Sequence, residues 1–388
     1  MNSVANNYNR KKIVFSHGKG IYLFTNKGEK YIDLAAGIAV NLLGHSNKDL
    51  INALNAQSRK LWHVSNLYEI EEQVTLANKL TNCSFANKVF FCNSGAEAVE
   101  CTIKAARRYH FSRGKPEKTE IITFKGSFHG RTLGTIAAAS NSSHLEGFGE
   151  PLKGFVSIER NDINQLKKAC NEKTAAILIE PVQGEGGINV FDREFINSLQ
   201  VIAKEMDLLI LFDEVQCGVG RTGKIFAYQW FDIKPDVMAL AKGLGGGFPI
   251  GACLMRDDIA EALIPGTHGS TFGGNPLAMA VGNCVMDIVN KVDFLSNVEK
   301  NGLFFENQLN KRCEKYPNVI AEIRGLGLMI GIKCSVANNL LANKLYENGI
   351  LTVNAADNVI RILPPLNITM SEIKKVMSLF EKSIKEIL

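Results

Sequence analysis

The 388-residue sequence lacks the long apolar runs and charge blocks that mark membrane proteins and nucleic-acid-binding proteins. No apolar stretch approaches the roughly 18 residues of a membrane-spanning helix, and residues 1–15 contain no signal-peptide core. The 44 basic and 39 acidic residues leave a net charge of +5, without a basic block or an aromatic–basic stripe. These absences argue against membrane surfaces and nucleic acids as partners.

Cysteine pairs and metal-ligand spacings are missing as well. The nine cysteines are odd in number, and none forms a C-x-x-C pair or a zinc-type spacing with histidine. We therefore expect reduced thiols, no metal site and a cytoplasmic location. The hydrophobic content of 46% and the charged content of 21% are ordinary for a soluble globular protein. At this length more than one lobe is expected.

Short apolar runs alternate with helical patterns through the middle of the chain. Helices are expected from Gly95 to about Phe111 and from Glu194 to Met206. Strand, helix and strand in repetition predict an α/β fold with a doubly wound, mostly parallel sheet. The runs that predict buried strands are Val89–Cys92, Ile121–Phe124, Ala175–Ile179, Leu208–Phe212 and Val237–Ala241.

The two ends of the chain show different patterns. Residues 21–34 predict a β-hairpin. From Leu277 a single helix is expected as far as Cys313, and the strands and helices that follow end in a helix capped by Thr369 and Glu372. This last part of the chain predicts a separate, smaller lobe.

Two of the apolar runs end in charged residues. Asp213 follows Leu208–Phe212, and Lys242 follows Val237–Ala241. Both side chains should face the crevice at the carboxyl ends of parallel strands, where α/β proteins bind ligands. A buried lysine has a lowered pKa and offers a neutral amine to carbonyls, and an ionised aspartate keeps a pyridine nitrogen protonated. The pair suggests pyridoxal phosphate, although a lysine or a strand-end acid alone is more often a solvated surface group.

A turn of small residues follows the strand Val89–Cys92. Ser94 is the expected N-cap of the next helix, and Glu97 would complete a capping box. Because Gly95 and Ala96 are small, the free amides of the first turn can approach an anion closely. The turn is a candidate phosphate cradle, with an ordinary capped helix as the alternative.

The loop after Ile121–Phe124 contains an aromatic residue and a cation. Phe128 suits stacking on a planar ring, and Arg131 suits bidentate capture of a carboxylate. The alternatives are a packed phenylalanine and a solvated arginine. His129 between them is interpreted as a structural residue, because Lys242 already supplies a base.

Four further polar residues are candidates for ligand contacts. Arg361 stands inside the apolar run Val359–Leu363, where a charge is costly unless it is paired. A ligand carboxylate or Glu185, which lies in a glycine-rich loop, could pair with it. Ser270 and Thr271 carry hydroxyls that could donate to a phosphate or a carboxylate.

One glycine-rich segment imitates a nucleotide-binding motif. Gly218–Lys224 contains G-x-G-x-x-G and also fits the first seven positions of the P-loop pattern. Ile225 occupies the eighth position and has no hydroxyl for magnesium, and no acid follows about twenty residues later at a clear strand end. Nucleotide binding is therefore disfavoured, and a glycine-rich surface loop is expected.

From about Phe15 to Leu388 the sequence resembles the class III pyridoxal-phosphate aminotransferases of the ornithine/acetylornithine type. The segments GIAVNLLGH at 37–45 and LWHVSNLY at 61–68 are most similar to the acetylornithine branch. The motifs that carry the resemblance, in their order along the chain, are NSGAEAVE at 93–100, FHGRT at 128–132, EPVQGEGG at 180–187, LFDEVQCGVGRTG at 211–223, LAKGLGGGFPIGA at 240–252 and STFGGNP at 270–276.

The resemblance implies a fold type I pyridoxal-phosphate transferase with three parts. Residues 1–45 form an N-terminal segment that packs with the small domain. Residues 46–276 form the large cofactor-binding domain, with a mostly parallel sheet flanked by helices. Residues 277–388 form a smaller α+β domain.

The resemblance also implies roles at the cofactor. Lys242 holds pyridoxal phosphate covalently and then carries a proton between the substrate carbon and the cofactor. Asp213 pairs with the ring nitrogen, Gln216 reaches the ring hydroxyl, and Phe128 and Val215 lie on the two faces of the ring. The phosphate is bound by the turn Ser94–Ala96 and by Thr271 of a neighbouring subunit, so a homodimer with shared active sites is implied.

The substrates implied by the resemblance are N-acetylornithine and 2-oxoglutarate. Arg131, helped by Ser270, would bind the carboxylate of the amino donor. Arg361 would bind a carboxylate of 2-oxoglutarate and pair with Glu185 when the donor occupies the site.

Several other functions remain open from the sequence. Ornithine, succinylornithine, 4-aminobutyrate and N-succinyl-diaminopimelate are alternative donors for the same core. A racemase or mutase of the same fold needs the same lysine and aspartate. A non-catalytic interaction protein and a nucleotide-binding protein that uses Gly218–Lys224 are the readings outside this chemistry.

Overall fold

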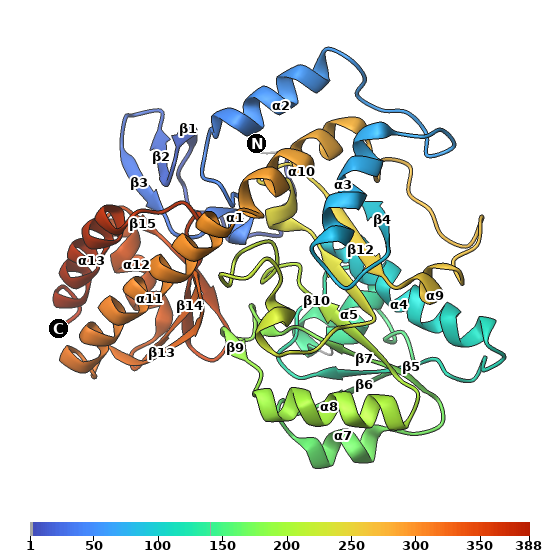
Figure 1. The fold of residues 1–388 in the computed structure, drawn as a ribbon. Helices are drawn as coiled ribbons and strands as arrows, with labels where there is room; N and C mark the ends of the chain where they lie inside the picture. Colours follow the sequence, from blue (N-terminus) through green and yellow to red (C-terminus); the bar gives the residue numbers. More distant parts are fainter. Residues whose placement is uncertain (1–2, 140) are drawn as a thin grey trace.

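The fold is built around a seven-stranded sheet in the computed structural model, which describes residues 3–139 and 141–388 (Figure 1). The strand order is β4-β12-β11-β10-β7-β5-β6. β12 runs antiparallel to both of its neighbours, and the other pairs are parallel, so the predicted mostly parallel sheet is confirmed. The strands are β4 (Lys88–Cys92), β5 (Glu120–Phe124), β6 (Phe155–Ile158), β7 (Thr174–Ile179), β10 (Leu209–Asp213), β11 (Val237–Leu240) and β12 (Gly251–Met255).

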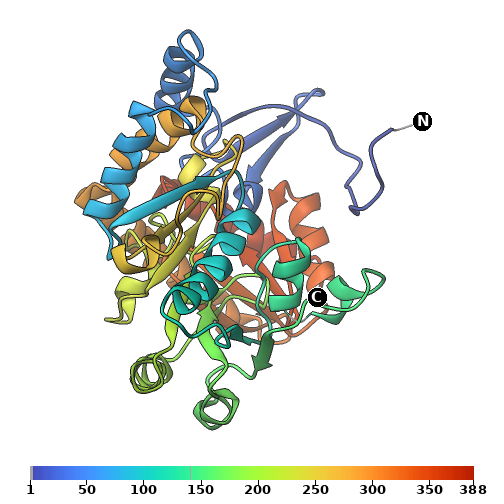
Figure 2. The ribbon, with the colours of Figure 1, turned by 90° about the vertical axis from the view of Figure 1, so that its right-hand side faces the viewer.

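Helices cover both faces of this sheet because alternate residues of its strands are apolar on both sides. In β10, Leu209 and Leu211 pack in one buried cluster with α4, whereas Ile210 and Phe212 pack in another with α8. Figure 2 shows α7 and α8 end-on, side by side below the sheet. The helices and short elements of this part are α2 (Lys48–Ser58), α3 (Glu71–Asn82), α4 (Gly95–Ser112), α5 (Leu133–Ala139), α6 (Ser142–Leu145), α7 (Ile163–Ala169), α8 (Arg193–Glu205), α9 (Asp257–Ala260), β8 (Val182–Gln183), β9 (Asn189–Val190) and the 3₁₀ turns η1 (Ala227–Trp230) and η2 (Lys242–Gly245).

The two ends of the chain meet in one small sheet. β3 pairs in parallel with β15, and Figure 1 shows the blue N-terminal strands beside the red C-terminal elements. This pairing supports the predicted packing of residues 1–45 with the C-terminal domain; the domain boundaries themselves stay predictions. The elements are β1 (Phe15–Lys19), β2 (Tyr22–Thr25), β3 (Lys30–Asp33), α1 (Ala36–Ala39) and β15 (Ile350–Leu351).

The C-terminal part has its own antiparallel sheet in the order β13-β14-β17-β16, covered by three helices. Thr369 and Glu372 form the predicted capping box at the last helix. In the described part of the chain, no helix is long and apolar enough to cross a membrane. The elements are β13 (Ile320–Leu326), β14 (Met329–Cys334), β16 (Val353–Ala355), β17 (Val359–Ile362), α11 (Val292–Lys315), α12 (Asn338–Glu347) and α13 (Met370–Lys385).

The single helix predicted from Leu277 to Cys313 is wrong. The structure has two helices, α10 (Pro276–Val289) and α11, and Lys291 between them adopts an extended conformation. The helix breaks here because its two halves pack against different parts of the fold. α10 lies against α2 and α3, whereas α11 lies against β13 and α13.

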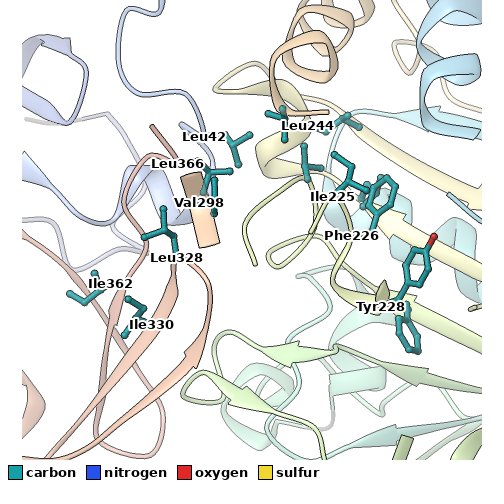
Figure 3. Close-up of a cluster of buried hydrophobic side chains, with 14 of the residues drawn as sticks. Leu42, Ile225, Phe226, Tyr228, Leu244, Val298, Leu328, Ile330, Ile362 and Leu366 are labelled. Atoms are coloured by element: carbon teal, nitrogen blue, oxygen red, sulfur yellow. The ribbon is translucent and has the colours of Figure 1, made fainter. Parts of the chain in front are cut away.

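The expectation that Gly218–Lys224 is a surface loop is also wrong. Most of the segment is buried, and Arg221 donates from Nη1 to the backbone oxygens of Leu328 at 3.1 Å and Pro364 at 2.5 Å. The loop is buried because it lies where the C-terminal part packs on the large sheet. Figure 3 shows the apolar cluster of this junction, with Ile225 and Leu328 among its residues.

Candidate active site

Most of the predicted cofactor residues line one cavity of about 430 Å³ at the carboxyl ends of the parallel strands. They come from segments that are far apart in the sequence, and the strand ends bring them together. The predicted residues that line the cavity are Ser94, Gly95, Ala96, Phe128, Arg131, Asp213, Val215, Gln216 and Lys242.

Lys242 is the first residue of η2, and one residue, Ala241, separates it from the end of β11 at Leu240. Its pKa is lowered mainly because the surrounding protein removes the ammonium group from water. The carboxylates of Glu185 and Asp213 oppose this shift, and the charge of Arg361 adds to it. The net effect favours the neutral amine, which is the form that attacks a carbonyl.

Two hydrogen bonds hold the side chain of Asp213, which is almost completely buried. Its Oδ1 accepts from the backbone N–H of Val215 at 3.0 Å, and its Oδ2 lies 2.8 Å from Nδ1 of His129. Both Asp213 and His129 are buried. With its orientation fixed on both sides, the carboxylate can present a lone pair to a group bound in the cavity.

His129 lines the cavity and contacts Asp213, which agrees with its interpretation as a hydrogen-bonded structural residue, although its partner was not predicted. The strand order places β7 between β5 and β10, so the loop after β5 must cross β7 to reach Asp213. The sequence does not show that order. The only hint in the sequence was that His129 adjoins Phe128, which was itself a candidate for the cofactor site.

Glu180 is a second residue that the sequence reasoning passed over. It follows β7, lines the cavity, and accepts a hydrogen bond from the backbone N–H of Phe128 at 2.9 Å. Burial first, and the nearby Asp213 second, raise the pKa of Glu180 well above its usual value. The signal was the same as for Asp213, because Glu180 is an acid at the end of a fully buried strand.

The turn at the start of α4 has the geometry of an anion cradle. Ser94 Oγ accepts from the backbone N–H of Glu97 at 3.2 Å, which confirms the N-cap. The second half of the predicted capping box is wrong, since the Glu97 carboxylate accepts from Asn93 instead. The amides of Gly95 and Ala96 line the cavity and, in the first turn, have no intrahelical partner.

Gly95 is needed at this point for a steric reason. A Cβ atom on Gly95 would lie 2.6 Å from Cγ1 of Val215, which also lines the cavity. Any larger residue would displace the valine that was predicted to contact the cofactor ring.

The two candidate arginines differ in burial and in pairing. Arg361 is 1% exposed and forms a bidentate pair with Glu185, with distances of 2.6 and 3.0 Å. It also donates to Oε1 of Gln216 at 3.3 Å and to the backbone oxygen of Asn354 at 3.1 Å. The predicted pairing of Arg361 with Glu185 is therefore present in this structure.

Arg131 is exposed and lines the cavity. Its guanidinium carbon lies 5.6 Å from the ring centroid of Phe128. Within residues 3–139 and 141–388, no carboxylate forms an ion pair with Arg131. A ligand carboxylate can therefore bind there without displacing a protein group.

Ser270 and Thr271 lie apart from this cavity. They line a neighbouring cavity of about 350 Å³, where Ser270 Oγ accepts from Nδ2 of Asn93 at 3.2 Å. Thr271 is exposed and does not line the cavity that contains Lys242 in its own chain. Its predicted contact with a phosphate of another subunit stays a prediction.

Comparison with known proteins agrees with this site. The sequence profile of the family described as "Aminotransferase class-III" matches residues 3–384. The chain belongs to the class-III aminotransferase family. Members of the family depend on pyridoxal phosphate, and the protein is a pyridoxal-phosphate-dependent transaminase.

Individual relatives in this family cover nearly the whole chain. A protein of Mesorhizobium japonicum named acetylornithine aminotransferase is 52% identical over 369 residues, 95% of this chain and 92% of its own length. A protein of Agrobacterium fabrum with the same name is 53% identical over 372 residues, 96% of this chain and 93% of its own.

Solved structures show the same fold. The N-acetylornithine aminotransferase of Stenotrophomonas maltophilia K279a has a TM-score of 0.86 and 36% identity, covering 98% of this chain and 97% of that one. The ornithine aminotransferase of Toxoplasma gondii ME49 has a TM-score of 0.95 and 31% identity, covering 99% and 93%.

The residues of the class-III site fit the cofactor. Pyridoxal phosphate needs an anion site, a carboxylate for its ring nitrogen and an amine for its aldehyde. The α4 turn, Asp213 and Lys242 supply these groups on different walls of one cavity. When bound, the cofactor supplies the electron-withdrawing ring that stabilises negative charge on the substrate carbon.

We expect His129→Ala to weaken cofactor binding and kcat by roughly ten- to a hundredfold, because the Asp213 carboxylate loses a buried hydrogen-bond partner. Cofactor dissociation followed by fluorescence and the pH dependence of the cofactor's visible band are the measurements. His129→Asn, which places an amide N–H near the position of Nδ1, should restore most of both.

His17→Ala is the matched control, since His17 is an exposed histidine on β1. Equal cofactor affinity in His129→Ala and His17→Ala would show that His129 does not position Asp213.

Proposed function

We propose that the protein transfers the terminal amino group of N2-acetyl-L-ornithine to 2-oxoglutarate. The products are N-acetyl-L-glutamate 5-semialdehyde and L-glutamate, and the reaction belongs to arginine biosynthesis. The observation that carries the proposal is the pair of arginines beside one lysine, with Arg131 open and Arg361 covered by Glu185. The names of the relatives support the same donor.

The charges of the substrates explain why two different arginines are needed. N-acetylornithine has one carboxylate, and its acetylated amine is neutral. The carboxylate can bind Arg131 while the uncharged chain carries the terminal amine toward Lys242. An uncovered Arg361 would then be a buried charge without a partner, and Glu185 removes that cost.

2-Oxoglutarate has a second carboxylate, which we propose replaces Glu185 on Arg361. Glu185 is suited to leave because its side chain is one third exposed and its loop contains Gly184, Gly186 and Gly187. The exchange swaps one carboxylate for another on the same guanidinium. The substrate that lacks a second carboxylate and the substrate that has one can thus use one site in turn.

We assign the remaining roles by position in the cavity. Lys242 Nζ would hold the cofactor and move the proton at the substrate carbon that bears the amine. Asp213 would pair with the ring nitrogen, and Gln216, which accepts a hydrogen bond from Arg361, would reach the ring hydroxyl. Phe128 and Val215 would contact the ring, and Ser94–Ala96 would hold the phosphate.

We also propose a homodimer with shared sites. Trp62, Leu67 and Phe272 are 64%, 87% and 61% exposed, an unusual display of large apolar side chains. These residues gather on one surface, because Asn66 donates to the backbone oxygens of Ser270 and Gly273 and so ties the two segments together. Thr271 lies within this apolar surface.

A cytoplasmic location is proposed from the cysteines. All nine are unpaired, as expected in a reducing compartment. Recovery of the active protein from a secreted fraction would contradict this placement.

The donor is tested by single-turnover half-reactions on the enzyme loaded with pyridoxal phosphate. We expect N-acetylornithine to bleach the cofactor's visible band rapidly, and ornithine, 4-aminobutyrate and N-succinyl-diaminopimelate to bleach it slowly. A higher rate constant with free ornithine would move the protein to another specificity within the family. Absence of any band after loading would contradict the assigned site.

Replacement of Arg361 tests the exchange of carboxylates. Arg361→Ala should raise the KM for 2-oxoglutarate by a hundredfold or more, since a buried charged hydrogen-bonded pair is lost. The half-reaction with N-acetylornithine should change much less. Arg324→Ala is the control, because Arg324 donates to the backbone oxygen of Gly187 in the same loop and pairs with Asp357 rather than with Glu185. Normal 2-oxoglutarate turnover in Arg361→Ala would refute the assignment.

The dimer is tested by placing a charge on its proposed surface. Leu67→Lys should convert a particle of twice 42.6 kDa into one of 42.6 kDa in light scattering and should lower activity. Val292→Lys is the matched control, since Val292 is 80% exposed at the start of α11, outside that surface. A wild-type mass of 42.6 kDa, or two variants with the same mass, would argue against this interface.

A further inference from the structure

Glu100 is an acidic residue of α4 that has no part in the roles assigned above. It lies one turn after Ala96 on the same face of the helix, and it lines the neighbouring cavity of about 350 Å³. Its Oε1 accepts a hydrogen bond from Oγ1 of Thr132 at 2.5 Å, a distance typical of a hydroxyl that donates to a carboxylate. Gly134 leaves room for this contact, because a Cβ atom there would lie 2.5 Å from the same oxygen.

The hydroxyl that Glu100 binds belongs to the residue directly after Arg131. Thr132 is also fixed at the start of α5, where its N–H donates to Oγ1 of Thr135 at 3.0 Å and its Oγ1 accepts from the N–H of Thr135 at 3.2 Å. Thr135 is fully buried. Thr132 is therefore held from two sides, by α4 through Glu100 and by the first turn of α5.

The residue directly before Arg131 is pressed against α4 as well. Gly130 has a φ angle of 131°, and a Cβ atom on it would lie 2.7 Å from Cβ of Ala96 and 2.8 Å from Oγ1 of Thr135. Only glycine fits such a close approach at this backbone angle. α5 packs beside α4 just after this point (Figure 1). Both neighbours of Arg131 in the chain are thus held against the same helix.

One helix therefore relates two parts of the proposed site. The first turn of α4 contains Gly95 and Ala96, which are assigned to the cofactor phosphate, and the next turn holds the backbone beside Arg131 through Glu100. The Arg131 side chain itself is exposed. The contact at Glu100 limits where that guanidinium can stand relative to the cofactor. This distance matters for an amino donor, since its carboxylate must reach Arg131 while its terminal amine reaches Lys242.

We propose that Glu100 is a positioning residue for the reaction: through the hydroxyl of Thr132 it fixes Arg131 relative to the phosphate-binding turn. Glu100 contacts neither substrate nor cofactor in this assignment. The inference rests on the proposed function, and it names the contact that sets the place of the substrate carboxylate.

Single-turnover reaction of N-acetylornithine with the enzyme loaded with pyridoxal phosphate tests the inference. Glu100→Ala should lower the second-order rate constant about tenfold, because a misplaced binding group costs orientation. The loss should appear mainly as a higher concentration for half-maximal rate. Glu100→Gln, whose amide oxygen still accepts from Thr132, should restore most of it. Glu172→Ala, which removes an exposed acid before β7, should react like wild type.

The partner of the contact gives a second pair of variants, which keeps the test open if Glu100→Ala does not fold. Thr132→Val removes the hydroxyl and keeps the shape, so it should reproduce the loss. Thr132→Ser keeps the hydroxyl and should retain most of the wild-type rate constant.

A double-mutant cycle separates positioning from a general structural effect. In an Arg131→Ala background the guanidinium is gone, so adding Glu100→Ala should cause little further loss. If Glu100 only stabilised the fold, the two losses would multiply. The dissociation constant of pyridoxal phosphate, followed by fluorescence, should be the same in Glu100→Ala and wild type.

Three results would overturn the inference. They are a wild-type rate constant in both Glu100→Ala and Thr132→Val, losses that multiply in the double variant, and a loss of cofactor affinity in Glu100→Ala as large as its loss of rate. The proposed function survives each of them as long as Arg131→Ala alone reacts much more slowly than wild type. A wild-type rate constant in Arg131→Ala would be a failure of the proposed carboxylate site itself.

Discussion

The site depends on keeping one negative charge, that of Asp213, inside a cavity from which the protein excludes water. A second acid, Glu180, ends the neighbouring strand, and two adjacent buried carboxylates cannot both ionise at low cost. The different surroundings of the two carboxyl groups resolve this conflict. Burial first, and Asp213 second, raise the pKa of Glu180 well above its usual value, and its carboxyl group accepts from the Phe128 backbone, whereas Asp213 receives the Val215 amide and contacts His129. The charge is thereby placed where a ring nitrogen can use it.

Charge pairing also governs the substrate half of the site. Lys242 is influenced by Glu185 and by Arg361, which are themselves paired. If a substrate carboxylate takes the place of Glu185 on Arg361, one negative charge leaves the guanidinium and another arrives. The field at the lysine then changes little between the two half-reactions. A lysine that must move protons in both directions with two substrates benefits from such a charge-conserving exchange.

The sequence predicts this site well where chemistry and strand ends coincide. Lys242 and Asp213 are polar residues that directly follow apolar runs, so their meeting follows from the parallel sheet alone. The partner of His129 was not predicted, because its contact with Asp213 depends on β7 lying between β5 and β10, and strand order is a property of the assembled sheet. Burial of Arg221 was missed for a similar reason, since its partners are carbonyl oxygens of a part more than a hundred residues away.

Backbone conformation sets another limit on what a sequence reveals. Residues 36–39 all have positive φ angles, although only one of them is glycine, and such angles are costly for alanine and isoleucine. The turn is held by Asp33, whose Oδ1 accepts from the amides of Ala35 and Ala36. No local sequence pattern predicts this turn, yet the next residue, Val40, lines the cavity. Tertiary contacts offset the free-energy cost of these backbone angles.

These features divide the site into a part fixed by the sheet and a part free to vary. Asp213, Glu180 and Lys242 lie at or just after the ends of strands that are buried on both faces, so a change in them disturbs the core as well as the chemistry. Arg131 is exposed in the loop after β5, so a substitution there costs little packing. Relatives named for ornithine and for acetylornithine share the fold. A change at such an exposed loop position can alter the contact with a substrate carboxylate without disturbing the residues that the buried strands hold.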